Sequence, residues 1–314
     1  MKITKEAFGQ FTEYVLTNPE SGEALYVIPE YGGIIRKMTL QKEGHFHKII
    51  DCGDTEEQIL ADKAAYPSAH LFPWANRVRD GKYAFQGTHY QLPINEVALN
   101  NAIHGLVAFA KFEVIQAEIN ENEAILTIKY VYEGQERGYP YPFDLEIKHT
   151  FSSDDGLLMT YTLKNTGKTD MPMVLGWHPY FKIDDENADD WQISIPTKSK
   201  FLSDEQMIPK GQEAIDLKEL TAIRDSQLDT VFSVEPTTRS ITKLNSPARN
   251  LTLNVWQDAQ KGQFLYTVVY IPATRDRIAI EPMTGNTDAF NSNDGLLVLE
   301  SENSLVLNCG VYIS

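Results

Sequence analysis

DLEIKHTFSSDDGLLMTYTLKNTG, residues 144–167, contains two runs in which apolar and polar side chains alternate. A period of two residues is typical of a β-strand with one buried face. Between the runs lies the polar segment SSDDG, which ends in Gly156, and glycine adopts positive φ without a steric penalty. The segment therefore predicts an antiparallel hairpin, and strands that are neighbours in sequence are expected to be neighbours in the sheet.

Similar alternating segments, separated by Gly, Asn, Asp and Pro, recur along the chain and predict an all-β protein. Examples are ALYVIPEYGG (24–33), EAILTIKYVYEG (123–134), FLYTVVYIP (264–272), RIAIEP (277–282) and SLVLNCGVYI (304–313). Helical patterns are short and are expected only at EEQILADKAA (56–65) and DLKELTAIRD (216–225). No linker or low-complexity tract divides the 314 residues, so we expect a single domain over 1–314.

The charge of the chain bears on its partners. A formal net charge of -16, from 44 acidic and 28 basic residues, repels nucleic acid and anionic lipid, so neither is an expected partner. The first residues contain no signal-peptide run and no window is apolar enough for a membrane span, so we expect a cytoplasmic protein. The two cysteines, Cys52 and Cys309, lie in no metal-ligand spacing and are expected to be small buried or half-buried thiols outside any disulfide framework.

VLGWHPYF (174–181) is the first candidate for chemistry. Alternation places Gly176 and His178 on one face of a strand and Leu175 and Trp177 on the other, where they suit packing against a second sheet. A glycine beside the imidazole leaves room for a ligand, and Pro179 is expected to end regular pairing. A histidine hydrogen-bonded within the core is the alternative interpretation.

RIAIEPMTG (277–285) repeats this arrangement around Glu281. Ala279 and Glu281 share one face, and Pro282 is expected to break the strand after them. Burial at such a position raises the pKa of a carboxylate and tunes it as a base near neutral pH. The alternative is a glutamate that only stabilises the strand end.

Several polar residues in turn-rich segments are further candidates. His104 in NNAIHGLV suits a loop over a cleft, and Arg77, which follows Asn76, could clamp vicinal hydroxyls or form a structural ion pair. Asp229 in QLDTVF carries a weaker signal, and Asp288 or Asp294 could supply a second carboxylate for glycoside hydrolysis. No nucleophile elbow, phosphate loop, dinucleotide motif or metal motif is present, which leaves proton transfer by carboxylate and histidine.

The segments NRVRDGKY, NNAIHG, GWHPYF, LDTVF and EPMTGNTDAFN follow one another in an order that resembles the aldose 1-epimerase, or galactose mutarotase, family. The resemblance spans essentially the whole chain. It implies a large, mostly antiparallel β-sandwich, the galactose mutarotase-like supersandwich, with the sugar bound in an open cleft. It also implies interconversion of the α and β anomers of a free hexose such as glucose or galactose, without a cofactor or a catalytic metal.

Carried onto this chain, the family pattern implies that Glu281 is the general base and His178 the general acid. His104 would be a second imidazole at the sugar, and Arg77, with its neighbour Asn76, and Asp229 would hold substrate hydroxyls. The mechanism requires Glu281 to start ionised and His178 to start protonated. The protein would act as a monomer or a homodimer.

Two departures from the family pattern bear on the substrate. HGLVAFAKF replaces the usual HGG segment, and LDTVF lacks the His or Asn that often follows the aspartate. A hexose-6-phosphate 1-epimerase is therefore an alternative, with Arg77, Arg79 and Lys82 as phosphate ligands. A non-catalytic carbohydrate-binding protein is another, and it would use Trp74, Trp177 or Tyr180 as a platform. An acidic surface could also hold calcium.

Overall fold

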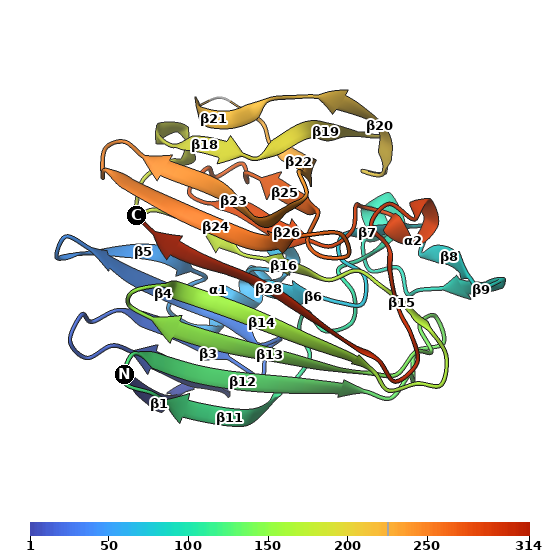
Figure 1. Cartoon of the computed structure of the whole chain (residues 1–314), viewed down its shortest axis with the longest axis horizontal. Coiled ribbons are helices and arrows are strands. Elements are labelled where there is room, and N and C mark those ends of the chain that lie inside the picture. The colour runs from blue at the N-terminus through green and yellow to red at the C-terminus, as the bar shows by residue number, and fades with distance from the viewer. Residues whose placement is uncertain (225) are drawn as a thin grey trace.

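The computed structural model describes residues 1–224 and 226–314 (Figure 1). The hairpin expected at residues 144–167 is formed by β13 (Phe143–Ser152) and β14 (Gly156–Asn165), which pair antiparallel from Phe143 opposite Asn165 to Ser152 opposite Gly156. Gly156 has a φ of +67°, in the left-handed region that its turn requires. Local alternation and turn chemistry were sufficient to predict this unit.

Within the described residues, the hairpin belongs to a nine-stranded antiparallel sheet. Its strands, in spatial order, are β11 (Glu113–Ile119), β12 (Glu123–Tyr132), β13, β14, β28 (Ser304–Ile313), β24 (Leu251–Ala259), β23 (Thr237–Ser246), β18 (Gln192–Ile195) and β21 (Leu217–Ala222). The C-terminal strand β28 lies between β14 and β24, so the two halves of the chain are joined at the middle of the sheet.

A second large sheet carries the candidate site. Its order is β20 (Pro209–Ala214), β19 (Thr197–Ser203), β22 (Asp229–Val234), β25 (Tyr266–Tyr270), β26 (Ile278–Met283), β16 (Gly176–His178) and β6 (Ala69–Leu71), with β17 (Tyr180–Phe181) also paired to β26. A third sheet contains β1 (Lys2–Phe8), β2 (Phe11–Thr17), β3 (Ala24–Ile28), β4 (Ile34–Lys42) and β5 (His45–Asp51). Strand pairs β7 (Arg77–Arg79) with β10 (Asn101–Ile103), β8 (Lys82–Phe85) with β9 (Thr88–Gln91), and β15 (Met171–Met173) with β27 (Leu297–Leu299) complete the strands.

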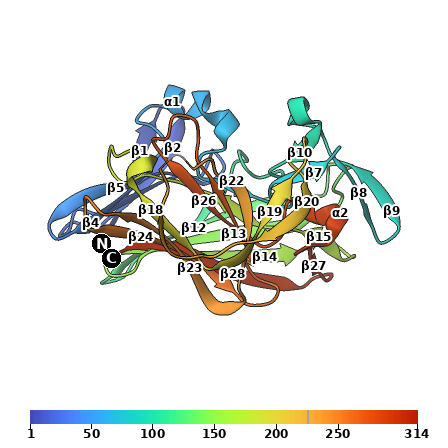
Figure 2. The ribbon, with the colours of Figure 1, turned by 90° about the horizontal axis from the view of Figure 1, so that it is seen from above.

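The sheets enclose one apolar cluster that extends from Phe8 to Val311. Alternation along β26 sends Ile278 and Ile280 into this cluster and leaves Glu281 on the opposite face. Seen from above in Figure 2, the nine-stranded sheet lies on one side of β26, and α1 (Glu56–Ala61) and the β7–β10 pair lie on the other. The all-β, mostly antiparallel architecture expected from the sequence is confirmed.

Helices are short. The expectation at 56–65 is confirmed by α1, which Thr55 caps, and by the 3-10 turn η1 (Lys63–Ala65). The other short helical elements in the described chain are η2 (Val97–Leu99), η3 (Ala188–Asp190) and α2 (Ala289–Ser292).

The helix expected at 216–225 is wrong. Residues Leu217–Ala222 form strand β21, which pairs with β18 at the edge of the large sheet, and Asp225 lies outside the described residues. Pairing with a strand some 25 residues upstream outweighed a weak local helical pattern. Cys52 and Cys309 are buried free thiols, as expected. Among the described residues, no helix has the length and apolar character needed to cross a membrane.

Candidate active site

Strand register places Glu281 and His178 opposite each other in the second sheet. Gly176 on β16 pairs with Met283 and Tyr180 on β17 pairs with Ala279, so the same register sets His178 opposite Glu281. Residues directly opposite in an antiparallel pair share a face. The His178 Nε2 and Glu281 Oε1 atoms lie 3.4 Å apart.

The predicted end of pairing at Pro179 is confirmed, since β16 ends at His178 and β17 begins at Tyr180. The predicted strand break at Pro282 is wrong, because β26 continues through it to Met283 and Pro282 pairs with Thr267 on β25. On its other edge, β26 pairs with β16 at Gly176 and with β17 at Tyr180, and the pairing is interrupted between these two residues. Pro282 lies opposite this interruption, so its lack of an amide N–H costs no hydrogen bond of the sheet.

Asp229 reaches the same face through the next row of the sheet. It pairs with Tyr270 on β25, Tyr270 pairs with Ala279 on β26, and Ala279 pairs with Tyr180 on β17. Asp229 is thus displaced from the His178–Glu281 row by one step along this face of the sheet. Strand register thus brings together three residues that are each more than 50 positions apart in the sequence.

The β7–β10 pair supplies the opposite wall. Arg77 lies opposite Ile103, and His104 follows directly, with its amide N–H donating to the Asn76 carbonyl at 3.1 Å. Asn76 and His104 both have left-handed backbone, with φ of 59° and 64°. This turns the His104 ring toward His178, and the ring centroids are 5.3 Å apart. Tyr66, after η1, closes this side with its ring 4.5 Å from His104.

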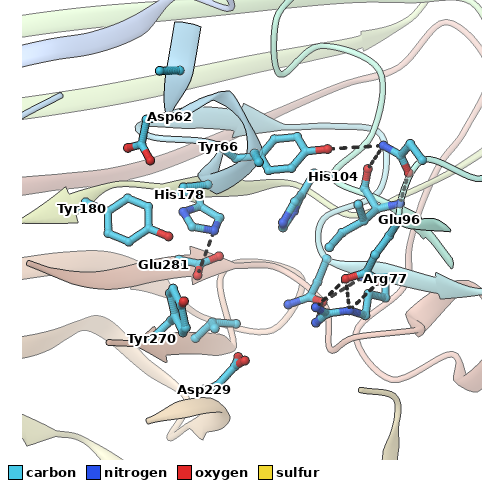
Figure 3. A pocket seen from close by; sticks show the side chains of 17 residues that line it. Asp62, Tyr66, Arg77, Glu96, His104, His178, Tyr180, Asp229, Tyr270 and Glu281 are labelled. Atoms are coloured by element: carbon cyan, nitrogen blue, oxygen red, sulfur yellow. Dashed lines mark hydrogen bonds and ion pairs between the residues drawn. The ribbon is translucent and has the colours of Figure 1, made fainter. Parts of the chain in front are cut away.

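These walls enclose a pocket of about 560 Å³ (Figure 3). The six residues that the family resemblance assigns to the site all line it: Glu281, His178, His104, Arg77, Asn76 and Asp229. The volume falls in the range usual for small-molecule sites. No group of three or more His, Cys, Asp or Glu side chains in residues 1–224 and 226–314 is arranged to hold a metal ion.

Three buried polar atoms in this pocket have no hydrogen-bond partner among the described residues. They are His104 Nδ1, His178 Nδ1 and Glu281 Oε2. Buried polar atoms are nearly always paired, because an unpaired one costs about 1–3 kcal/mol. Each of the three atoms belongs to a side chain that lines the pocket, but the atom itself is covered by protein, so these groups add to the cost of burying the polar side chains of the site.

Burial shifts the acid and the base toward their neutral forms. Loss of hydration lowers the pKa of His178 to about 4, and the nearby Arg277 and Arg77 charges add to this effect. Desolvation also raises the pKa of Glu281 well above its usual value, with a further contribution from the Asp229 charge. The ligand-free pocket therefore favours a neutral imidazole and a protonated carboxyl, the reverse of the starting forms that the sequence-based mechanism requires.

Desolvation also shifts the pKa values of the neighbouring His104 and Asp229. Desolvation lowers the pKa of His104 well below its usual value, and the His178 ring adds to this effect. Asp229 is exposed at the mouth of the pocket, yet partial desolvation of its carboxylate raises its pKa, while Arg77 opposes the shift. The positive charge of Arg77 thus acts to lower the pKa of both Asp229 and Glu281.

Two expectations about neighbouring residues are wrong. A Cβ on Gly176 would lie 2.9 Å from Ala75 Cβ, so the space beside this glycine is filled by protein and not by ligand. Trp74 and Trp177 are 1% and 0% exposed and cannot be sugar platforms, because sheet packing covers them. Tyr180, by contrast, lines the pocket.

Arg79 and Lys82, the alternative phosphate ligands, and Asp288 and Asp294, the alternative carboxylates, all lie outside the pocket. Arg79 pairs with Asp204, and Lys82 borders a separate depression on the β8–β9 hairpin. Asp288 accepts from the Arg79 amide and Asp294 from Asn286, and neither lines the pocket. Among the described residues that line the pocket, Arg77 is the sole lysine or arginine.

Sequence reasoning missed Glu96, Asp62 and Tyr66, which also line the pocket. Glu96 binds the Arg77 guanidinium, and Asp62 binds Arg277 with oxygen–nitrogen distances of 2.6 and 3.1 Å. The ion-pair partners of Glu96 and Asp62 are distant in the sequence or follow no fixed spacing, so neither pair has a signature in the sequence. The single local signal is the turn composition around Asn95 and Glu96.

Comparison with known proteins identifies the family of this chain. The model of the aldose 1-epimerase family matches residues 12–311. This chain belongs to the aldose 1-epimerase family. Its relatives include the uncharacterized protein YihR of Escherichia coli K12, 29% identical over 246 residues, 75% of this chain and 76% of YihR. The galactose mutarotase of Mus musculus is 27% identical over 164 residues, 51% of this chain and 45% of the mouse protein.

Solved structures show the same fold for this aldose 1-epimerase family member. A galactose mutarotase-like protein from Clostridium acetobutylicum superposes with a TM-score of 0.89 at 19% identity, covering 100% of this chain and 98% of its own. The galactose 1-epimerase of Lactobacillus acidophilus NCFM has a TM-score of 0.80 at 16% identity, with the same coverage. The family supports an isomerase of aldoses as the general function.

Proposed function

We propose that this family member is a mutarotase that interconverts the α and β anomers of a free, uncharged hexose. The observation that carries the proposal is the pairing of Glu281 with His178 at 3.4 Å on the wall of one sugar-sized pocket. A base and an acid on one pocket wall suit a reaction that removes one proton from oxygen and adds another.

In the proposed mechanism, Glu281 takes the proton of the anomeric hydroxyl while His178 protonates the ring oxygen. The bond between C1 and the ring oxygen breaks, a carbonyl forms at C1, and rotation about C1–C2 presents its other face. Reclosure reverses both proton transfers. His104, Arg77, Asn76 and Asp229 would hold the remaining hydroxyls.

The ionisation of the pair follows from its geometry. One proton shared by Glu281 and His178 gives either two neutral groups or a carboxylate beside an imidazolium, with no exchange with solvent. The empty pocket favours the neutral arrangement, as the shifted pKa values of both groups indicate. A sugar hydroxyl that donates to Glu281 favours the carboxylate, so substrate binding would move the proton to His178.

An uncharged substrate is supported by the charges of the pocket. Arg77 is already paired with Glu96, and Asp62 is paired with Arg277. The Asp229 carboxylate is left without an ion-pair partner among the described residues that line the pocket. The dianion of a sugar phosphate would meet an excess of negative charge. This makes the 6-phosphate alternative less favourable than a free hexose such as glucose or galactose.

The test is the decay of optical rotation of fresh α-glucose and α-galactose. Glu281→Gln keeps the shape of the side chain but cannot accept the proton, so we expect turnover to fall about 10²- to 10⁴-fold. Binding of glucose by calorimetry and thermal unfolding are measured on the same variant and should change little.

Wild-type turnover in Glu281→Gln would remove Glu281 from the role of base. Glucose binding without faster mutarotation in the wild-type protein would favour a carbohydrate-binding protein. Release of free sugar from an aryl glycoside would favour a glycosidase, for which Asp229 is the carboxylate nearest to Glu281 in the strand register.

A further inference from the structure

Arg77 presents only one of its two hydrogen-bonding edges to the pocket. Its Nε donates to Glu96 Oε2 at 2.9 Å and its Nη2 donates to Glu96 Oε1 at 2.8 Å, which is a bidentate ion pair. The Nη1 group has only a long contact of 3.4 Å to Asn76 Oδ1. The edge formed by Nη1 and Nη2 is therefore the one left for a ligand.

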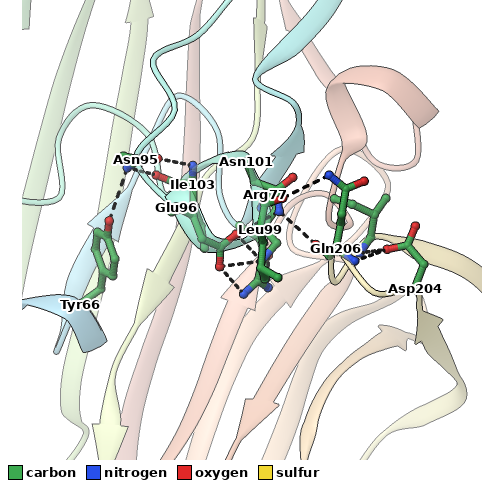
Figure 4. A network of polar contacts seen from close by, with 11 residues as sticks. Tyr66, Arg77, Asn95, Glu96, Leu99, Asn101, Ile103, Asp204 and Gln206 are labelled. Atoms are coloured by element: carbon green, nitrogen blue, oxygen red, sulfur yellow. Dashed lines mark hydrogen bonds and ion pairs between the residues drawn. The ribbon is translucent and has the colours of Figure 1, made fainter.

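Glu96 is itself held in place before any ligand binds (Figure 4). Its amide N–H donates to the Asn101 carbonyl at 3.1 Å, and the Asn101 amide N–H donates back at 3.2 Å. The Asn101 Nδ2 group donates both to Glu96 Oε2 and to the Gln206 carbonyl, each at 3.0 Å. Asn101 is fully buried, and its Nδ2 group links the Glu96 carboxylate to the loop between β19 and β20.

The charge of Arg77 is cancelled at short range by this contact. The side chains of Arg77 and Glu96 are 15% and 19% exposed, so solvent screens the pair only partly. A free guanidinium would bind a phosphate or carboxylate bidentately, as arginine does at anion sites. Paired with Glu96, it offers directed donors to neutral oxygens and little net attraction to an anion.

We infer that Glu96 is a positioning residue that determines specificity for uncharged aldoses. It orients the free edge of Arg77 toward two adjacent substrate hydroxyls, and its charge disfavours aldoses that carry a phosphate or carboxylate group. The inference rests on the proposed function and adds to it the reason why one arginine in the pocket does not recruit anionic sugars.

Three variants of the full chain separate orientation from charge. Glu96→Gln retains a hydrogen-bonding side chain of the same size and removes the charge, while Glu96→Asp retains the charge and withdraws it by one methylene. Asp144→Asn is the matched control, because Asp144 binds Lys129 at 2.8 Å in an ion pair of similar exposure and neither residue lines the pocket. Turnover and KM are measured by polarimetry, and affinity by calorimetry, with glucose, glucuronate and glucose 6-phosphate.

We expect Glu96→Gln to raise the ratio of anionic to neutral sugar affinity about tenfold, the scale of one hydrogen bond to a charged group. Glu96→Asp should raise KM for glucose with kcat nearly unchanged and leave the anions excluded. Asp144→Asn should change neither the affinity ratio nor the KM for glucose. A merely structural role for Glu96 would lower stability without altering the anion-to-neutral ratio.

An unchanged ratio in Glu96→Gln, together with an unchanged KM for glucose in Glu96→Asp, overturns the inference. Calorimetry keeps this outcome distinct from failure of the proposed function. If the wild-type protein does not accelerate mutarotation but binds sugar, the affinities alone decide the role of Glu96.

Discussion

Acid should destabilise this protein because some of its histidines are buried in their neutral form. His149, which lies outside the candidate site, allows this effect to be measured separately from the chemistry of the pocket. The His149 side chain is 0% exposed, and neither ring nitrogen has a hydrogen-bond partner in the described part of the chain. Burial lowers the pKa of His149 from 6.5 to about 4. The unfolded chain therefore binds a proton at this site before the folded protein does, as pH falls below 6.5.

The magnitude follows from the linkage of protonation and folding. Each pKa unit corresponds to about 1.4 kcal/mol, so the shift at His149 represents about 3 kcal/mol of unfolding free energy. This contribution is complete above pH 6.5 and is lost as pH falls toward 4. His149→Phe removes the titrating group. Between pH 6.5 and pH 4, the unfolding free energy of the wild type should therefore fall by about 3 kcal/mol more than that of His149→Phe.

Urea unfolding followed by tryptophan fluorescence at pH 7 and pH 4 measures the difference. His89, which is exposed on β9, provides the control, since His89→Phe replaces an imidazole that is hydrated in both states. His149→Leu serves if the larger phenyl ring overpacks the core. Parallel loss of stability in the wild type and both His149 variants would refute the argument from burial.

The remaining predictions concern the site and the turn beside it. In ¹⁵N-histidine spectra of the ligand-free protein, His178 should be neutral at pH 7, because burial lowers its pKa to about 4, and an imidazolium signal there would contradict this. His178→Asn should lose turnover about 10²-fold or more in polarimetry while still binding glucose, whereas weaker binding at wild-type turnover would reassign it to recognition. Gly105→Ala should lower the melting temperature far more than Gly87→Ala. Both glycines have positive φ, but only at Gly105 would the Cβ lie 2.2 Å from the Phe72 carbonyl oxygen, and equal effects would rule out that contact.

Much of this site was predictable because chain-local features mark it. Alternation identified the strands that carry His178 and Glu281, Pro179 marked the end of β16, and turn residues placed His104 in a loop. The errors at Pro282 and at residues 216–222 share one cause, since a local pattern does not reveal which distant strand will pair with a segment.

The sequence by itself determined the faces of the strands, the hairpin at 144–167 and the residue types available for proton transfer, because side-chain period and turn conformation depend on neighbours along the chain. Only the tertiary structure decided that His178 falls opposite Glu281, that Glu96 holds Arg77, and that burial drives the acid and base toward neutral forms. Strand register, ion pairing and desolvation depend on groups that are distant in sequence, so they exist only once the sheets have assembled.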